Sequence, residues 1–98
     1  MPAELKIPPA ALSDKKACEL VRAWAANGGL QCSLNVNAWP EDMATTGWGI
    51  LLSDIARHVA DAMQQTKNLD EAGTLSRIRS VFNSELDKPT ADVAGKFV

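Results

Sequence analysis

The chain has 98 residues, of which 46% are hydrophobic and 22% charged, and this balance predicts one globular domain with a single core. Its net charge of −2 provides no basic field, so neither nucleic acid nor an anionic membrane is an expected partner. The first residues lack a signal-peptide pattern and no apolar run is long enough to span a bilayer, so we expect a cytoplasmic protein.

Residues 1–12 are predicted to form an arm or a short edge strand. Polar and apolar residues alternate over 4–7, and Pro8 and Pro9 then interrupt any strand because proline cannot donate a ladder hydrogen bond. A helix is expected over residues 14–26, with Ser13 as its N-cap. Its apolar residues recur at helical spacing and are Ala17, Leu20, Val21 and Trp24. The Asn27-Gly28-Gly29 segment would end this helix.

Residues 30–37 are predicted to form a strand. Cys32, Leu34 and Val36 alternate with polar residues, as in a strand with one buried face. A single strand cannot satisfy its own backbone groups, so it must pair with residues 4–7, with residues 96–98 or with a second copy of the chain. We therefore expect a homodimer that extends the sheet.

The loop that follows, residues 38–47, contains candidate ligand-binding residues. Trp39 is followed by Pro40, and its ring would either cover the core or, if exposed, form a binding lip. Backbone N–H groups near the start of the next helix could bind an anion, although close packing of a tryptophan ring explains the glycines equally simply. The candidates around this helix start are Thr46, Gly47 and Gly49.

Two further helices complete the predicted domain. The longer spans residues 48–66, where apolar residues cover an arc of about 140° on one side. The second is expected over 69–87, with a capping box from Asn68 to Glu71. We expect the domain to occupy residues 13–88, followed by a loose tail over 89–98.

The run W-G-x-x-L-x-D-x-A-R-H-V-A over residues 48–60, preceded by ELVRAWAANGG over 19–29, resembles a family of small proteins of unknown function, mainly from proteobacteria. The resemblance extends over about residues 5–87. It implies a small bacterial α/β domain, and it implies no activity, cofactor or partner.

Candidate catalytic residues lie on the longest predicted helix. His58, the only histidine, stands one helical turn from Asp54 and three residues before Asp61, an arrangement that suits a general base or an ordinary surface ion pair. Catalysis needs further groups that the sequence does not supply at a recognisable spacing. No metal or cofactor is expected, and Cys18 and Cys32 are interpreted as reduced structural thiols.

These observations predict an α+β fold, a small two-layer sandwich of three helices packed on a short antiparallel sheet that a second copy extends. The favoured function is a non-enzymatic protein-interaction or regulatory module with a protein partner. The alternative is a small enzyme or ligand-binding protein that uses His58 and Asp54 beside a pocket near Gly47–Gly49.

Overall fold

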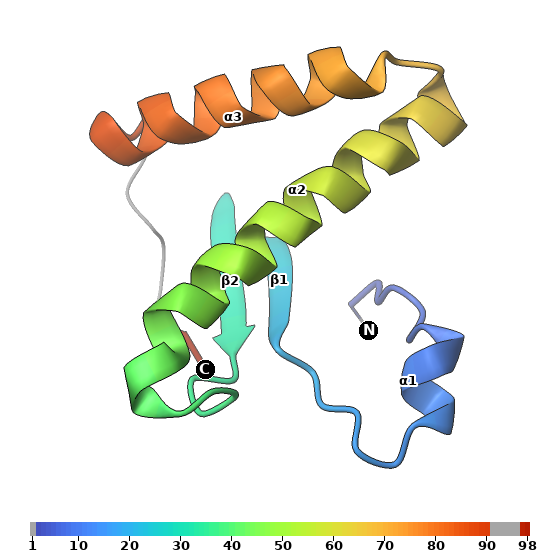
Figure 1. Ribbon diagram of the computed structural model, residues 1–98, viewed down its shortest axis with the longest axis vertical. Helices are drawn as coiled ribbons and strands as arrows, with labels where there is room; N and C mark the ends of the chain where they lie inside the picture. Colours follow the sequence, from blue (N-terminus) through green and yellow to red (C-terminus); the bar gives the residue numbers. More distant parts are fainter. Residues whose placement is uncertain (1, 91–96) are drawn as a thin grey trace.

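The chain forms a two-stranded antiparallel hairpin followed by a pair of long helices, as Figure 1 shows for the computed structural model. The structure describes residues 2–90 and 97–98. The elements in chain order are α1 (Pro9–Ser13), β1 (Val21–Ala26), β2 (Gly29–Leu34), the 3-10 turn η1 (Glu41–Met43), α2 (Ala44–Lys67) and α3 (Glu71–Asp87). The predicted α+β class, with three helices and a short antiparallel sheet, is confirmed.

The hairpin turn corrects one sequence prediction. Ala26 pairs with Gly29, so Asn27 and Gly28 form a two-residue turn, with φ of 53° and 75°. Positive φ at both turn positions matches the twist of the flanking strands, and Asn-Gly is the preferred sequence for it. The predicted helix over 14–26 is therefore wrong, because these residues turn the chain back on itself instead of capping a helix.

The strand predicted over 30–37 is present as β2, but it ends at Leu34, and its main partner is β1, which was not among the expected partners. The register places Val21 opposite Leu34 and Ala23 opposite Cys32, so one face of the hairpin is apolar. Residues 4–7, one of the expected partners, are not in a strand.

The other side of β2 is bonded to the end of the chain. The N–H of Val98 donates to the carbonyl of Cys32 over 3.0 Å, and the N–H of Leu34 donates to the carbonyl of Val98 over 2.7 Å. Val98 thus belongs to one of the predicted partner segments and is not part of a loose tail, whereas Lys96 lies outside the described residues. Because Val98 uses these two groups, this part of the β2 edge is not free for another chain.

The helix boundaries differ from the predicted ones by a few residues. α2 begins two residues before the expected cap Thr46, directly after η1. Asn68 ends α2 in the left-handed conformation, with φ of 55°, and the Oδ2 of Asp70 caps α3 by accepting a hydrogen bond of 2.7 Å from the N–H of Gly73. The N-cap of α3 is therefore Asp70 and not Asn68, and the predicted capping box does not form, because the third residue after Asp70 is Gly73.

Within the described residues, the helical pair contains the one fully buried apolar side chain, Ala60, which is 1% exposed. α3 runs back along α2 from the Asn68 turn and then diverges from it (Figure 1). No described Cα of the hairpin lies within 8 Å of a Cα of α2. The backbones of the hairpin and of α2 therefore do not approach each other closely.

The surface area measures how open this arrangement is. The chain exposes 8598 Å², whereas a compact monomer of 10.5 kDa exposes about 5,400 Å². The radius of gyration is 15.3 Å, compared with about 13 Å for a compact domain of this length. Within the part of the chain that the structure describes, no helix combines the length and the apolar character needed to cross a bilayer.

Candidate functional site

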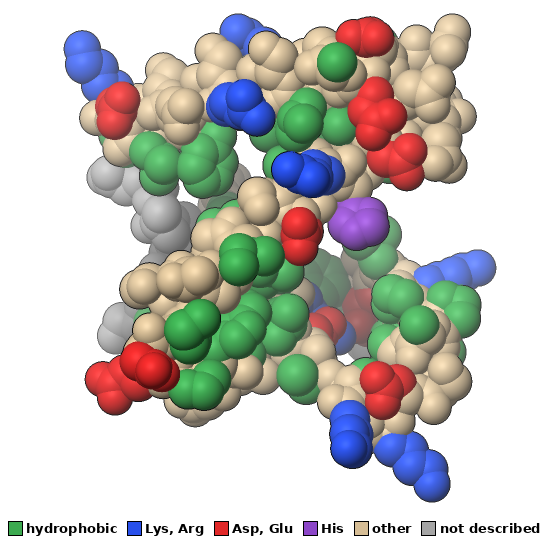
Figure 2. All heavy atoms as spheres, viewed as in Figure 1, with side chains coloured by type: hydrophobic (Ala, Val, Ile, Leu, Met, Phe, Trp, Pro, Cys, Tyr) green, Lys and Arg blue, Asp and Glu red, His purple; other side chains and the backbone are tan. Residues whose placement is uncertain are grey.

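The candidate catalytic residues of α2 lie on the open surface. His58, Asp54 and Asp61 are all exposed, and Figure 2 shows the imidazole in purple on the surface, near the middle of the view. The Oδ2 of Asp61 accepts a hydrogen bond of 2.9 Å from the side-chain amide of Gln65. The helix therefore places these three side chains near one another on its surface and does not enclose them.

Trp39 and Gly47, two of the candidate ligand-binding residues, are brought into direct contact. The indole of Trp39 lies over the backbone of Gly47, so closely that a Cβ there would stand within 2.9 Å of three ring atoms. The same indole meets Trp48 edge to face, with ring centroids 5.4 Å apart and planes at 73°. Gly47 is thus a point of close packing for a tryptophan ring, and that ring belongs to Trp39.

The remaining candidates do not join this cluster. Thr46 and Gly49 are exposed, and a Cβ at Gly49 would meet no atom within 4 Å. His58 follows Gly47 by eleven residues on one helix, which separates them by about 16 Å along its axis. The structure therefore does not combine the histidine and the glycines in one pocket.

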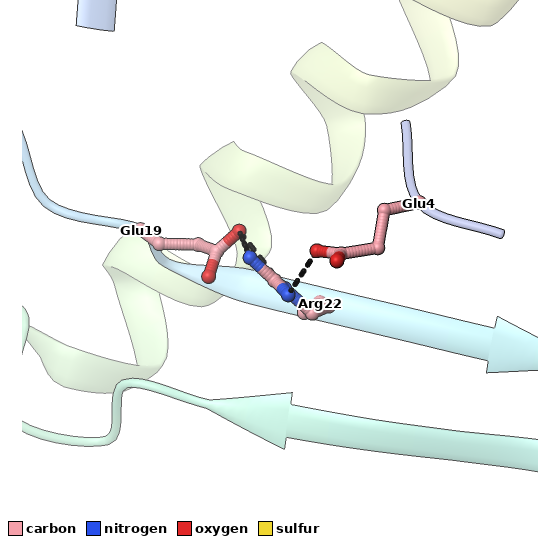
Figure 3. A network of polar contacts seen from close by, with 3 residues as sticks. All are labelled: Glu4, Glu19 and Arg22. Carbon is pink, nitrogen blue, oxygen red and sulfur yellow. Dashed lines mark hydrogen bonds and ion pairs between the residues drawn. The ribbon is translucent and has the colours of Figure 1, made fainter. Parts of the chain in front are cut away.

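Arg22 on β1 forms a polar network that the sequence did not reveal (Figure 3). Its Nη1 contacts the Oε2 of Glu4 at 3.0 Å, and its Nε and Nη2 each contact the Oε2 of Glu19 at 3.2 Å. The hydrogen bond and charge of Glu19, together with the weaker effect of Glu4, raise the pKa of Arg22 above its ordinary value. The spacing of Glu19 and Arg22 was a possible signal, but Glu4 lies eighteen residues away.

This network lies beside an open groove of about 630 Å³, formed by the N-terminal arm and by the segment that leads into β1. Residues 3–8 line one side and residues 17–24 the other. Two carboxylates already balance the charge of Arg22, so the groove offers no unpaired guanidinium to an anionic ligand. The Glu4–Arg22 ion pair instead connects the arm to β1.

Several large apolar side chains on the helical pair are also uncovered. Leu52, Ile55 and Val59 form a stripe on α2 and are 47%, 38% and 38% exposed. On α3, the apolar stripe includes Leu75 and Ile78, which are half-buried where α3 packs against α2. The stripe continues beyond the point where the two helices diverge, and its side chains there are uncovered: Phe82 is 46% exposed and Leu86 is 68% exposed. We call these five exposed side chains the helical fork.

Within residues 2–90 and 97–98, the cysteines and acidic residues form no further cluster. Cys18 is exposed, Cys32 is half-buried, and both are free thiols. Among the residues that the structure describes, no group of three or more histidine, cysteine, aspartate or glutamate side chains is placed to hold a metal ion.

Comparison with known families identifies the chain. The sequence model of a domain of unknown function, DUF5076, matches residues 4–90. The chain belongs to the DUF5076 family. This match confirms the resemblance to a small protein family of unknown function.

The DUF5076 chain is also similar to a solved structure, that of a candidate pyruvate dehydrogenase from the photosynthetic bacterium Rhodopseudomonas palustrus CGA009. The similarity covers 98% of this chain and 95% of that chain, with 32% sequence identity and a TM-score of 0.71. A comparison with curated proteins finds no match.

Proposed function

We propose that this DUF5076 protein is a non-enzymatic protein-interaction module that works as a homodimer in the cytoplasm. The observation that carries the proposal is the exposed area of 8598 Å², which exceeds by about 3,000 Å² the area of a compact monomer of this mass. Obligate homodimer interfaces bury about 2,000–5,000 Å² over the two subunits, or about 1,000–2,500 Å² per subunit. A second copy would therefore cover a large part of the excess surface on each chain and add to the small core that one chain forms.

A copy of the same chain is the partner best suited to this need. Every molecule carries the same uncovered apolar surface from the moment it folds, and an identical chain is available in equal amount. Two-fold dimers bury the same patch on both subunits, so one self-complementary surface is sufficient. The small net charge of −2 opposes such an association only weakly.

The cytoplasm fits the cysteine chemistry, because Cys18 and Cys32 are free and the cytoplasm keeps thiols reduced. An interaction or regulatory role fits the exposed apolar side chains of the helical pair. A further protein partner would bind the assembled dimer.

Sedimentation equilibrium of the full chain, over a range of micromolar concentrations, tests the proposal. We expect a mass twice the chain's 10.5 kDa and a melting temperature that rises with protein concentration, because association stabilises only the folded chain. A stable monomer, with a melting temperature independent of concentration, would show that the proposal is wrong.

A further inference from the structure

We infer that the second copy docks on the helical fork, the surface formed by Leu52, Ile55 and Val59 of α2 and by Phe82 and Leu86 of α3. This inference rests on the proposed function and adds the location of the dimer interface. It places the two-fold contact on the helices, whereas the sequence favoured an extension of the sheet.

The first argument is that the fork continues from the end of the helical pair where α2 and α3 pack together. Near the Asn68 turn the helices pack closely, Ala60 is buried, and Leu75 and Ile78 are half-buried. Beyond this seam the same stripe of α3 continues to Phe82 and Leu86 with no described element against it. An apolar stripe that is buried at one end and uncovered at the other is continuous with a core, so adding helices there would extend that core.

The exposed apolar side chains of the two helices are the second argument. Five large ones on this part of α2 and α3 are between 38% and 68% exposed, and exposed apolar surface of this kind marks protein interfaces. Two copies of this surface, facing each other around a two-fold axis, would place four helices side by side. Helices in such bundles bury their apolar stripes against one another.

The edges of the hairpin offer a less complete site. Val98 already bonds the outer edge of β2 at Cys32 and Leu34. The outward-facing backbone groups of β1 belong to Val21, Ala23 and Ala25, whose side chains add little apolar area. Pairing through β1 is therefore the alternative that the experiment must separate from docking on the fork.

Two matched substitutions on α2 test the location. Ile55 lies on the fork, and Ile50, which is 57% exposed, lies about 140° around the same helix. Ile55→Glu should raise the dimer dissociation constant at least 30-fold, because it buries an unpaired charge at the interface, whereas Ile50→Glu should change it less than threefold. Sedimentation equilibrium measures both constants. If the wild-type chain is a dimer and Ile55→Glu leaves it intact, or if Ile50→Glu is the damaging change, the fork is not the interface.

A second measurement does not depend on whether the variants fold. In a mixture of ¹³C-labelled and unlabelled wild-type chains, intermolecular NOEs should reach the methyl groups of Leu52, Ile55 and Val59. NOEs that instead connect Ala23 or Ala25 to the second copy would overturn the inference and place the contact on β1, while the homodimer itself would stand. A wild-type monomer would overturn the inference and the proposed function together.

Discussion

The hairpin and the helical pair owe their shapes to different interactions. In the hairpin, paired backbone groups and the Asn27-Gly28 turn fix the register over six residues on each strand. In the helical pair, side-chain burial near Ala60 holds α3 against α2. The hairpin is thus specified by local turn chemistry, while the helices depend on tertiary packing.

This difference explains why the uncovered apolar surface lies mainly on the helices. A two-stranded hairpin can satisfy its ladder hydrogen bonds internally, although it is only marginally stable by itself. An amphipathic helix leaves its apolar stripe in water until another element covers it. α2 has 24 residues, and α3 follows only part of that length before it diverges (Figure 1).

Gly47→Ala should have the largest effect among three glycine substitutions that test this comparison. The new methyl group would overlap the indole of Trp39, and we expect a loss of about 2 kcal/mol in the free energy of unfolding, because overpacking outweighs the helix propensity of alanine. Urea denaturation at fixed protein concentration measures the loss.

Gly49→Ala is the matched control, two residues further along α2. A Cβ there meets no atom within 4 Å, so alanine should raise the free energy of unfolding by about 0.5–1 kcal/mol. Equal effects at both positions would mean that Trp39 does not pack on Gly47 in solution.

Gly28→Ala should have a smaller effect than Gly47→Ala, and for a different reason. A Cβ at Gly28 meets no atom within 4 Å, but its φ of 75° is one that alanine adopts at a cost. We expect a loss of about 1 kcal/mol from backbone conformation alone. Gly28→Asn should cost less, since asparagine tolerates this region.

Hydrogen exchange locates the damage in the Gly28→Ala variant. Amides of β1 and β2 should exchange faster, whereas the amide of Ala60 should keep its protection if the hairpin and the helical pair open independently. Loss of protection at both places would indicate that the two regions form one cooperative unit.

The sequence predicted the elements in which the spacing of apolar residues fits only a helix or only a strand. The arc of apolar residues over 48–66 identified α2, and the alternation around Cys32 and Leu34 identified β2. Residues 14–26 were ambiguous, because Val21 and Trp24 fit a helical spacing as well as a strand. The Asn27-Gly28 pair decided the outcome in favour of a hairpin, and as a turn signal it should have outweighed the spacing.

Contacts between distant segments were beyond the reach of sequence patterns. Nothing in the local sequence connects Glu4 to Arg22 or selects Val98 as a neighbour of Leu34. For the candidate site, the sequence offered close packing of a tryptophan ring as one explanation of the glycines, but it did not indicate that the ring over Gly47 is that of Trp39. The sequence also could not predict which part of the α3 stripe is uncovered, because the divergence of the two helices depends on their packing and not on either stripe alone.

The smallest predicted effect concerns a polar contact at the end of α3, away from the buried seam. Glu85 accepts hydrogen bonds from the hydroxyl and the backbone N–H of Thr90, at 2.7 and 2.8 Å, and these bonds lower the pKa of Glu85, with the hydroxyl as the larger cause. Because the folded pKa lies below the unfolded one, the contact stabilises the fold at higher pH, and this contribution is lost as the pH falls through the folded pKa, below the ordinary value of 4.5.

Thr90→Val tests this contact, because it removes the hydroxyl and keeps the backbone donor. The pKa of Glu85 should rise in the variant, though not fully to its ordinary value, and NMR titration of the side-chain carboxyl carbon measures it. The exposed position of Thr90 limits the change in stability, so the pH titration is the more sensitive measurement. An unchanged Glu85 pKa would mean that the hydroxyl does not bind the carboxylate in solution, and the end of α3 would then depend on its backbone cap, in which the N–H of Lys88 donates to the carbonyl of Ser84.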